Sequence, residues 1–290
     1  MLNETQPEQL FMLHRPLLFS LAYRMLGSVH DAEDIIQEAY FTLSETSIEQ
    51  VQNPKAYLCK IVTNRCIDLL KSARKKRETY VGPWLPEPLI IDTEKDPEQN
   101  YMMKESISTA YLLLLEQLSE TERAVFLLRE VLQYDYEYIA EVVGKSSTNC
   151  RQIFHRARKA VGNHRASDQI PTPRAAALTE QFVTAIVSGN VNKLLSLLAV
   201  DATLLSDGGG KTKAAVLPIL GAERIVRFYM GILAKFTEDF SYKFTTVNGD
   251  PGIILYVENK VFGVLSLHIQ NGLIHQIYWV VNPEKLTHIK

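Results

Sequence analysis

Apolar residues recur at helical spacing along the first quarter of the chain. Leu21 and Met25 belong to the first of three such sets, and turn signals at Gly27 and Asn53 separate each set from the next. A spacing of three to four residues lines up one apolar stripe along each helix, which then packs against its neighbours. The pattern predicts an all-helical unit over residues 9–77.

Two proline-containing breaks divide the rest of the chain. The segment 80–100 holds four prolines around an apolar centre, WLPEPL, and each proline disfavours helix at the residue before it. Helical periodicity resumes over 104–165, and a polar break, SDQIPTPR, follows at 167–174. We therefore expect a linker, a second helical domain and a second, shorter linker.

The last third of the chain has a different pattern of hydrophobic residues. Helical patterns precede four runs rich in Val, Ile, Tyr and Phe, and Gly or Asn bounds these runs, as in strands joined by hairpins. This predicts an α+β fold in which helices pack on an antiparallel sheet. The chain is thus expected to be multi-domain, with two all-α domains followed by an α+β domain. The predicted boundaries are 1–78 for the first domain, 79–103 for the linker, 104–165 for the second domain, 166–174 for the second linker, and 175–290 for the α+β domain.

Composition is that of a globular protein without an export signal. The chain has 290 residues, 46% of them hydrophobic, and a formal net charge of -2. Its three cysteines form no CxxC pair, so neither a disulfide framework nor a zinc site is indicated. The N-terminus lacks a basic start followed by an apolar run, and no segment approaches the length of a membrane span. We expect a cytoplasmic protein that uses no metal or cofactor and binds no membrane.

The near-zero net charge hides two neighbouring segments of opposite sign. Residues 31–50 contain six acids and no Lys or Arg, whereas residues 54–77 contain eight bases and one acid. DNA would repel the acidic segment, and a basic protein surface would be attracted to it. The basic segment fits contact with DNA, although a cluster such as 74–77 is also common at a solvated helix end.

The segment 136–161 has the pattern of two helices around a turn at 144–147. Ser147 or Thr148 can cap the second helix, whose buried positions leave an outward face with bases and no acid. In a helix-turn-helix such a helix enters the major groove, where Gln and Arg make paired hydrogen bonds to base edges and Lys meets phosphate. A solvated helical hairpin is the alternative. The outward residues are Asn149, Arg151, Gln152, His155, Arg156 and Lys159.

These segments, in this order, resemble a bacterial sigma factor of the extracytoplasmic-function group. DAEDIIQEAY, at 31–40, resembles the region-2 helix that binds the coiled coil of the RNA polymerase β′ subunit. The run at 53–77 resembles the part of region 2 that melts and reads the promoter -10 element, and 118–161 resembles region 4, which reads the -35 element. The resemblance covers about 1–165 and implies two partners, promoter DNA and core RNA polymerase, the latter through its β′ coiled coil and β flap.

The resemblance also implies roles for individual residues. Capturing unstacked bases needs pockets, whereas reading a duplex needs a major-groove helix, so the two promoter elements are assigned to different helices. The run STNCRQIFHRA departs from the more usual Ser-Val-Lys type, so no promoter sequence is predicted. By resemblance, polymerase would be bound by Asp31, Asp34, Gln37 and Glu38, the -10 element by Asn64, Arg65, Asp68, Lys71 and Arg74, and the -35 element by the six outward residues named above.

Three consecutive glycines at 208–210 stand between Asp207 and Lys211. A phosphate-binding P-loop would need its first glycine where the chain has Leu205, so this interpretation fails at its first residue. A plain turn between strands is a second interpretation, because glycine tolerates positive φ. A third interpretation comes from a further resemblance.

The α+β tail resembles a SnoaL-like domain of the NTF2-like cone fold. A subgroup of extracytoplasmic-function sigma factors carries this fused domain with three marks, WLPEPL, DGGGK and NPxKL, and all three occur here. In that subgroup the tail is viewed as a built-in regulator of the sigma domains. The glycines would let backbone and linker approach closely, and Asp207 and Lys211 would supply polar contacts. The implied regulatory contacts are Trp84, Leu85, Pro86, Glu87, Asp207, Gly208, Gly209, Gly210, Lys211, Asn282, Pro283 and Lys285.

Other functions stay open for the tail and for the chain. Cone folds often enclose a cavity, so the tail is a candidate small-molecule sensor, or an acid–base catalyst using Asp207, His268 and His275. A lone strand His is more often packed or at the surface, so we do not expect an enzyme. A one-component helix-turn-helix repressor is a further alternative, but it would not need the DAEDIIQEAY surface. We expect a monomeric sigma factor that directs transcription initiation and that its own tail modulates.

Overall fold

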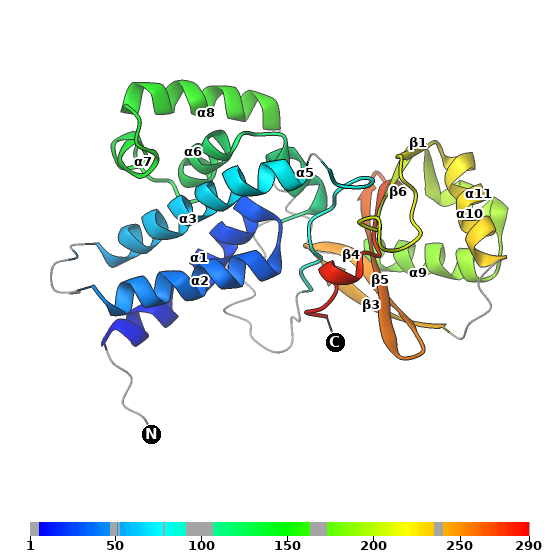
Figure 1. Cartoon of the computed structure of the whole chain (residues 1–290). Coiled ribbons are helices and arrows are strands. Elements are labelled where there is room, and N and C mark those ends of the chain that lie inside the picture. Colours follow the sequence, from blue (N-terminus) through cyan, green and yellow to red (C-terminus); the bar gives the residue numbers. More distant parts are fainter. Residues whose placement is uncertain are drawn as a thin grey trace. The chain divides into compact units, whose positions relative to one another are not determined.

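The computed structural model describes residues 6–46, 51, 53–77, 79–90, 107–162, 173–234 and 240–289. Contacts divide the chain into two compact units (Figure 1). The first unit contains the helices up to residue 162. The second unit contains the α+β domain together with residues 79–90 of the predicted linker and residues 107–110, which the sequence assigned to the second helical domain.

The first unit is all-helical, as the sequence predicts. Contacts join α1, α2 and α3 to one another, and α6 contacts both α1 and α3 as well as α7 and α8. The side chains of α6 are buried without interruption from Arg123 to Leu128, which is typical of a helix surrounded by others. The helices are α1 (Gln6–Leu26), α2 (Val29–Ser44), α3 (Pro54–Arg77), α5 (Thr109–Glu116), α6 (Glu120–Glu130), α7 (Tyr136–Val143) and α8 (Ser147–Val161).

The helix boundaries follow from short polar residues and glycines. Gly27 adopts a left-handed conformation after α1, and the hydroxyl of Ser28 accepts a hydrogen bond from the Asp31 backbone at 3.0 Å, which caps α2. Asn53 accepts in the same way from Ala56 at 3.0 Å at the start of α3. The turn signals predicted at Gly27 and Asn53 therefore mark real helix ends.

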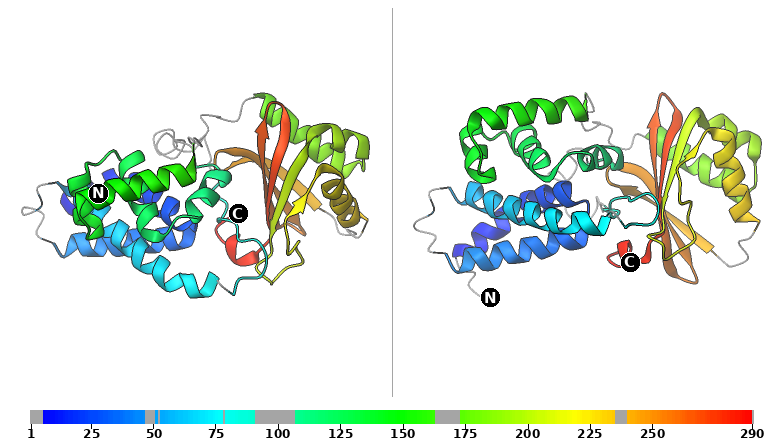
Figure 2. Two further views of the ribbon diagram at one scale, coloured as in Figure 1. Left: turned by 90° about the horizontal axis from the view of Figure 1, so that it is seen from above. Right: turned by 45° about the horizontal axis from the view of Figure 1, so that its top comes forward.

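Among its described residues, the second unit has three α-helices and a six-stranded sheet of order β2-β1-β6-β5-β4-β3. Figure 2 shows the helices gathered on one face of the sheet. The strand β1 pairs with β6 in parallel, so the predicted purely antiparallel sheet is wrong at this one pairing. The elements are α9 (Pro173–Val187), α10 (Val191–Leu197), β1 (Leu198–Asp207), β2 (Ile219–Leu220), α11 (Ala222–Leu233), β3 (Phe240–Val247), β4 (Asp250–Val257), β5 (Lys260–Gln270), β6 (Leu273–Val280) and the short 3-10 helix η2 (Pro283–Lys285).

The parallel pair has a physical cause that lies in the connection. Hairpins join β3 through β6 in sequence, whereas β1 precedes α11 and three further strands before it meets β6. A connection of that length permits a parallel neighbour, which a two-residue turn does not. The sequence analysis assigned no strand to the residues of β1.

Three two-residue hairpins join the last four strands. Both residues of each turn have positive φ, including 51° at Asn248 and 53° at Asn271, each followed by a glycine. Asn-Gly pairs adopt this conformation at low cost, and the resulting turn matches the right-handed twist of the strands. The predicted hairpins are therefore confirmed.

Candidate functional sites: the helical faces and the linker cluster

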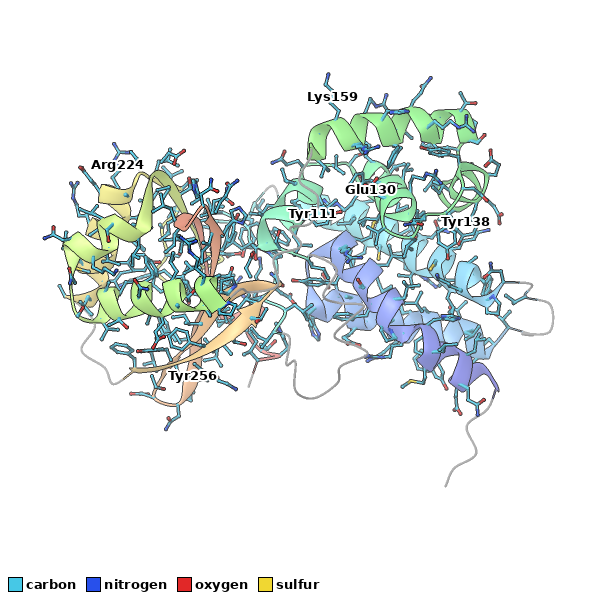
Figure 3. All side chains as sticks on the ribbon, turned by 180° about the vertical axis from the view of Figure 1, so that it is seen from behind. Tyr111, Glu130, Tyr138, Lys159, Arg224 and Tyr256 are labelled. Atoms are coloured by element: carbon cyan, nitrogen blue, oxygen red, sulfur yellow. The ribbon has the colours of Figure 1, made fainter. Side chains whose placement is uncertain are left out.

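Helix α8 presents the predicted DNA-reading residues to solvent. Its other face is buried and contacts α6 and α7. Figure 3 shows Lys159 extending outward from this helix. The exposed residues include all six that the sequence predicts, Asn149, Arg151, Gln152, His155, Arg156 and Lys159, and the buried ones are Cys150, Ile153, Phe154, Ala157 and Val161.

The turn before α8 is tight. Gly144 ends α7 in the left-handed conformation, and Ser146 caps α8 by accepting a hydrogen bond from the backbone of Asn149 at 3.2 Å. The predicted caps, Ser147 and Thr148, are therefore wrong, because the glycine reverses the chain early enough for the helix to begin at Ser147. The capped end leaves backbone N–H groups and a positive dipole at the helix start, which favours a phosphate there.

The outward face of α8 is basic and only weakly paired. The helix contains no Asp or Glu, and the Arg156 guanidinium is 3.9 Å from the Glu122 carboxylate on α6. The guanidinium of Arg151 lies over the ring of Tyr136, 5.2 Å from its centre. A pair this long, made by an exposed arginine, contributes little to stability, so these cations keep their capacity to bind phosphate.

The solvent face of α2 carries the predicted polymerase-binding residues. Asp31, Asp34, Gln37 and Glu38 are all exposed, and the opposite face of the helix is buried. Phe41, on the next turn, has 63% of its surface exposed. The face therefore combines negative charge with one large apolar side chain, which suits a partner that offers cations around an apolar recess.

The predicted -10 residues follow α3 at helical spacing. Arg65, Asp68 and Lys71 are exposed and Asn64 is half-buried. The Arg65 guanidinium lies 3.4 Å from the Glu38 carboxylate, which connects this face to the acidic face of α2. The side chain of Arg74, the fifth predicted residue, lies outside the described residues.

The helix-turn-helix packs against α3 within the first unit. The hydroxyl of Tyr138 donates to the backbone carbonyl of Ala56, and Lys60 lies 2.6 Å from the Glu141 carboxylate. Burial raises the pKa of the Tyr138 phenol, so the hydroxyl stays protonated and keeps donating. These contacts occupy the N-terminal half of α3, before its predicted -10 residues.

The buried cation Arg123 makes a second connection inside this unit. Its guanidinium donates to the carbonyl of Met25 at the end of α1 and lies 3.1 Å from the Glu116 carboxylate of α5. Burial lowers its pKa to about 10, which still leaves it charged at neutral pH. Arg123, a residue of the second helical domain, thus donates a hydrogen bond to a carbonyl at the end of a helix in the first helical domain.

In the second unit, the carboxylate of Asp207 bonds both to the linker and to the NPEKL motif near the C-terminus. Asp207 is fully buried and accepts hydrogen bonds from the Tyr80 hydroxyl at 2.5 Å and from the Leu85 backbone at 2.8 Å. The ammonium of Lys285 lies 2.8 Å from the same carboxylate and also donates to the Leu85 carbonyl. The nitrogen of Asn282 donates to the Tyr80 oxygen at 3.0 Å. Residues from WLPEPL, DGGGK and NPEKL therefore meet in one cluster.

Aromatic rings and backbone complete this linker cluster. The Lys285 ammonium lies 4.3 Å from the centre of the Trp84 ring, a favourable cation–π distance. Leu85, Pro86 and Glu87 are buried, so the apolar centre of the linker is covered. Lys211 points elsewhere and pairs with Glu284, and Pro283 is exposed at the start of η2.

The glycines form a turn after β1 and also permit close approach. Gly209 and Gly210 have φ values of 57° and 72°. A Cβ on Gly209 would come within 2.3 Å of the Asn282 nitrogen, and one on Gly208 within 2.4 Å of the Thr212 carbonyl oxygen. The turn and the close-approach interpretations are therefore both correct, since one loop does both.

Asn248, which the sequence did not single out, holds the linker at two points. Its backbone N–H donates to the Leu89 carbonyl at 2.9 Å, and its side-chain oxygen accepts from the Leu89 backbone at 3.0 Å. Its side-chain nitrogen donates to the Thr109 hydroxyl at 3.1 Å. Ile90 adds a bridge to Val247 at the end of β3. The Asn-Gly signal predicted the turn here but carried no sign of the linker.

The geometry does not favour catalysis through Asp207. Its carboxylate is already occupied by an ammonium and by linker donors, and a general base must be able to reach a substrate proton. His268 and His275 are half-buried strand residues. Among the described residues, no group of His, Cys, Asp and Glu could hold a metal ion, and no helix is long and apolar enough to cross a membrane.

Comparisons with known proteins agree with the helical part of the chain. Residues 10–76 match the model of sigma-70 region 2, and residues 108–161 match that of sigma-70 region 4. The region-2 match removes the one-component repressor alternative, which would not need that domain. The predicted fold class, two helical sigma domains followed by an α+β domain, is confirmed.

Similarity to curated and solved proteins extends through the α+β domain. The ECF RNA polymerase sigma factor SigJ of Mycobacterium tuberculosis is 31% identical over 284 residues, which cover 94% of this chain and 91% of the relative. A probable ECF RNA polymerase sigma factor of that organism, SigI, is 28% identical over 280 residues, 96% of this chain and 93% of the relative. The crystal structure of SigJ aligns with a TM-score of 0.76 at 29% identity, covering 96% of this chain and 97% of that one. The chain therefore belongs to the ECF RNA polymerase sigma factors, proteins that bind RNA polymerase and DNA to start transcription.

Proposed function

We propose that this sigma factor divides promoter recognition between two helices and holds polymerase with a third. The exposed bases of α8 support reading of the -35 element as a duplex, and the exposed residues 64–71 of α3 support capture of the -10 strand. The acidic face of α2 supports binding to the β′ coiled coil. A monomer acting in the cytoplasm, where its polymerase acts, fits these roles.

We further propose that the C-terminal domain regulates the sigma domains by holding the linker between them. The observation that carries this proposal is the linker cluster, in which the buried Asp207 accepts from both Tyr80 and Leu85. The matched sigma regions end at residue 76 and resume at 108, so residues 80–89 belong to the covalent tether between the two DNA-reading parts.

Asn248, in the turn between β3 and β4, also supports the proposal that the C-terminal domain holds the tether. It bonds Leu89 inside the tether and Thr109 at the start of α5, just after the tether, so a single turn holds the chain at both points. The separation that region 2 and region 4 can reach depends on the tether's free length. A domain that shortens the free length therefore restricts which promoter spacings the protein can use.

The test is run-off transcription with core RNA polymerase and the full chain. Asn248→Ala removes the side-chain hydrogen bonds to Leu89 and Thr109, so it should loosen the tether and change initiation on promoters of altered -10 to -35 spacing by about tenfold, without touching a DNA-reading residue. Asn271→Ala is the matched control, because Asn271 has the same residue type, turn position and positive φ in the next hairpin but one, and is exposed. Equal spacing preference for both variants would refute regulation through the tether and leave the sigma role intact.

A further inference from the structure

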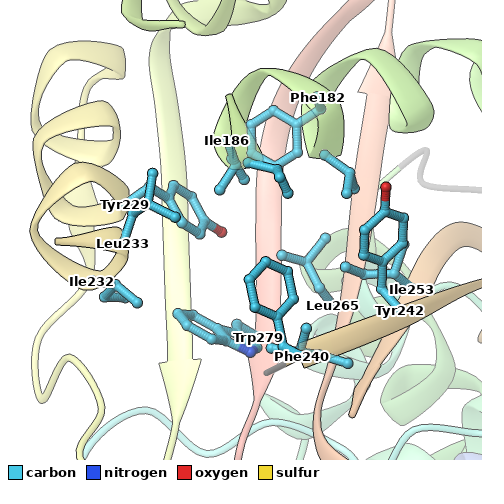
Figure 4. Close-up of a pocket in the computed structure, with 13 residues that line it drawn as sticks. Phe182, Ile186, Tyr229, Ile232, Leu233, Phe240, Tyr242, Ile253, Leu265 and Trp279 are labelled. Atoms are coloured by element: carbon cyan, nitrogen blue, oxygen red, sulfur yellow. The ribbon is translucent and has the colours of Figure 1, made fainter. Parts of the chain in front are cut away.

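The C-terminal domain contains an apolar cavity of about 100 Å³ that its role in holding the linker does not use. Helices α9 and α11 form one wall, and strands β3 to β6 form the other (Figure 4). Each of its thirteen lining residues is aliphatic or aromatic, with no acid, base or amide. A charged ligand is therefore excluded, because its charge would be buried without a partner.

One polar group inside the cavity lacks a partner. Tyr229 is 5% exposed, and its hydroxyl has no hydrogen-bond partner. Figure 4 shows this hydroxyl pointing from α11 toward the middle of the lining side chains. Burial raises the pKa of the Tyr229 phenol, so the oxygen keeps its proton and is available as a donor. An unpaired buried hydroxyl is destabilising, and a ligand that accepts a hydrogen bond from it would remove that cost.

A water molecule is a poor occupant of this cavity. Buried waters are held by two to four polar partners, and apolar cavities with none stay dry. The indole nitrogen of Trp279 lies on the sheet side, since a Cβ on Gly263 would come within 2.9 Å of it. Tyr242 is 38% exposed and lies at the cavity's edge. Among the described lining residues, Tyr229 is therefore the buried polar contact that a guest would find.

The walls favour a flat guest. Tyr229 stacks on Trp279 with ring centres 5.9 Å apart, and Phe182 meets Tyr229 edge-on at 5.7 Å. Aromatic surfaces bind other rings through offset stacking and edge contacts, in addition to the gain from apolar burial. Phe240, 36% exposed on β3, gives the cavity an edge that opens to solvent and hence an entry path.

We propose that this cavity is a binding site for a small uncharged molecule with one aromatic ring and one hydrogen-bond acceptor, which accepts a hydrogen bond from the Tyr229 hydroxyl. The proposal does not depend on the regulatory role of the linker cluster. The expected ligands are simple phenols and related aromatic alcohols or carbonyl compounds.

The test uses the full chain with p-cresol and toluene as probes, because the two differ only by the hydroxyl. Binding is measured by ligand-observed NMR and isothermal titration. The wild-type protein should bind p-cresol more tightly than toluene. Tyr229→Phe should weaken p-cresol binding about fivefold, the equivalent of one hydrogen bond, and leave toluene binding unchanged.

A second variant separates the cavity from unspecific adsorption. Leu255 is half-buried on β4 and lines the cavity, so Leu255→Trp should fill it and abolish binding of both probes, while unfolding at the same temperature as wild type within a few degrees. Three results would overturn the proposal: no binding of either probe to the wild type, unchanged binding to Leu255→Trp, or equal loss of both probes in Tyr229→Phe.

Discussion

The ammonium of Lys285 and the carboxylate of Asp207 form a 2.8 Å ion pair whose side chains are 9% and 0% exposed. Removing two charges from water is costly, and such a pair persists only where further hydrogen bonds satisfy both groups. Here those bonds come from the linker, because Tyr80 and Leu85 donate to the carboxylate and the Leu85 carbonyl accepts from the ammonium. The pair and the linker therefore stabilise each other.

We expect Asp207→Asn to destabilise the C-terminal domain by about 3–5 kcal/mol, because it leaves the buried Lys285 charge without its counterion. The exposed pair between Lys211 and Glu284 provides the control, and Lys211→Met should cost less than about 1 kcal/mol. Urea unfolding of both variants measures the difference. Similar losses for the two would mean that the buried pair has no special role.

Gly209→Ala should loosen the linker cluster, because both the backbone and the space oppose a side chain. Gly249 offers a matched comparison, since it also has positive φ, at 76°, but open space where a Cβ would be built. Gly249→Ala should cost about 1 kcal/mol from backbone strain alone. Gly209→Ala should cost more and increase proteolysis near residues 80–89, as followed by mass spectrometry. If both variants lose the same stability, the approach of Asn282 to Gly209 is not tight.

The sequence predicted helices, hairpins and exposed faces well because local patterns determine them. The alternation of buried and exposed positions in α8 follows from residue spacing, and the three Asn- or Gly-containing turns follow from their tolerance of positive φ. The parallel pairing of β1 with β6 was missed, since no local signal specifies which distant strand lies alongside. Asn248 was missed for the same reason, because its partners, Leu89 in the linker and Thr109 at the start of α5, are 159 and 139 residues away in sequence.

The candidate site, too, was predictable in part from the sequence. The three marks of the linker cluster were recognisable as short strings, but the roles within it were not. Both Lys211 and Lys285 were expected to contact the linker, but only Lys285 does so, because η2 brings it to the Trp84 ring while Lys211 pairs with Glu284. Tyr80 lay outside every quoted motif and still donates to Asp207.

Two variants on the outward face of α8 should distinguish the contribution of charge to DNA binding from the contribution of base recognition. Lys159→Ala should weaken binding to all sequences and lower the slope of log K against log salt by about 1. Gln152→Ala should leave that slope unchanged and relax preference at one base pair, at a cost of about 1–3 kcal/mol. Fluorescence anisotropy of promoter duplexes at several salt concentrations measures both. Arg224→Ala, an exposed cation on α11, is the control and should change neither.

The contact of α7 with α3 should depend on Tyr138 more than on the ion pair beside it. Tyr138→Phe removes a hydrogen bond to the Ala56 carbonyl and should cost about 1 kcal/mol or more, because it leaves that acceptor unsatisfied. Glu141→Gln breaks an exposed pair with Lys60 and should cost less. Energy transfer between dyes on α2 and α8 reports opening. A larger opening in Glu141→Gln than in Tyr138→Phe would reverse this ranking.

Stability of the C-terminal domain should fall as pH rises toward neutrality, because of Asp250. This side chain is 8% exposed, one carboxylate oxygen has no partner, and burial raises its pKa from 3.8 to about 7, partly offset by a hydrogen bond from the Thr109 backbone. The folded state therefore binds a proton that the unfolded state has lost between about pH 4 and pH 7. The unfolding free energy should decline across that window, by up to roughly 4 kcal/mol for a shift of about three units.

Asp250→Asn keeps the shape of the side chain and removes its titration. The variant should match the wild type near pH 4 and exceed it in stability above pH 7, so the difference between their unfolding free energies should grow with pH. Asp201→Asn, an exposed acid on β1, controls for the loss of one negative charge. Urea unfolding from pH 4.5 to 8 gives the comparison. A difference that stays flat across this range would mean that Asp250 is solvated or paired in solution, and that Thr109 is not held beside a protonated carboxyl.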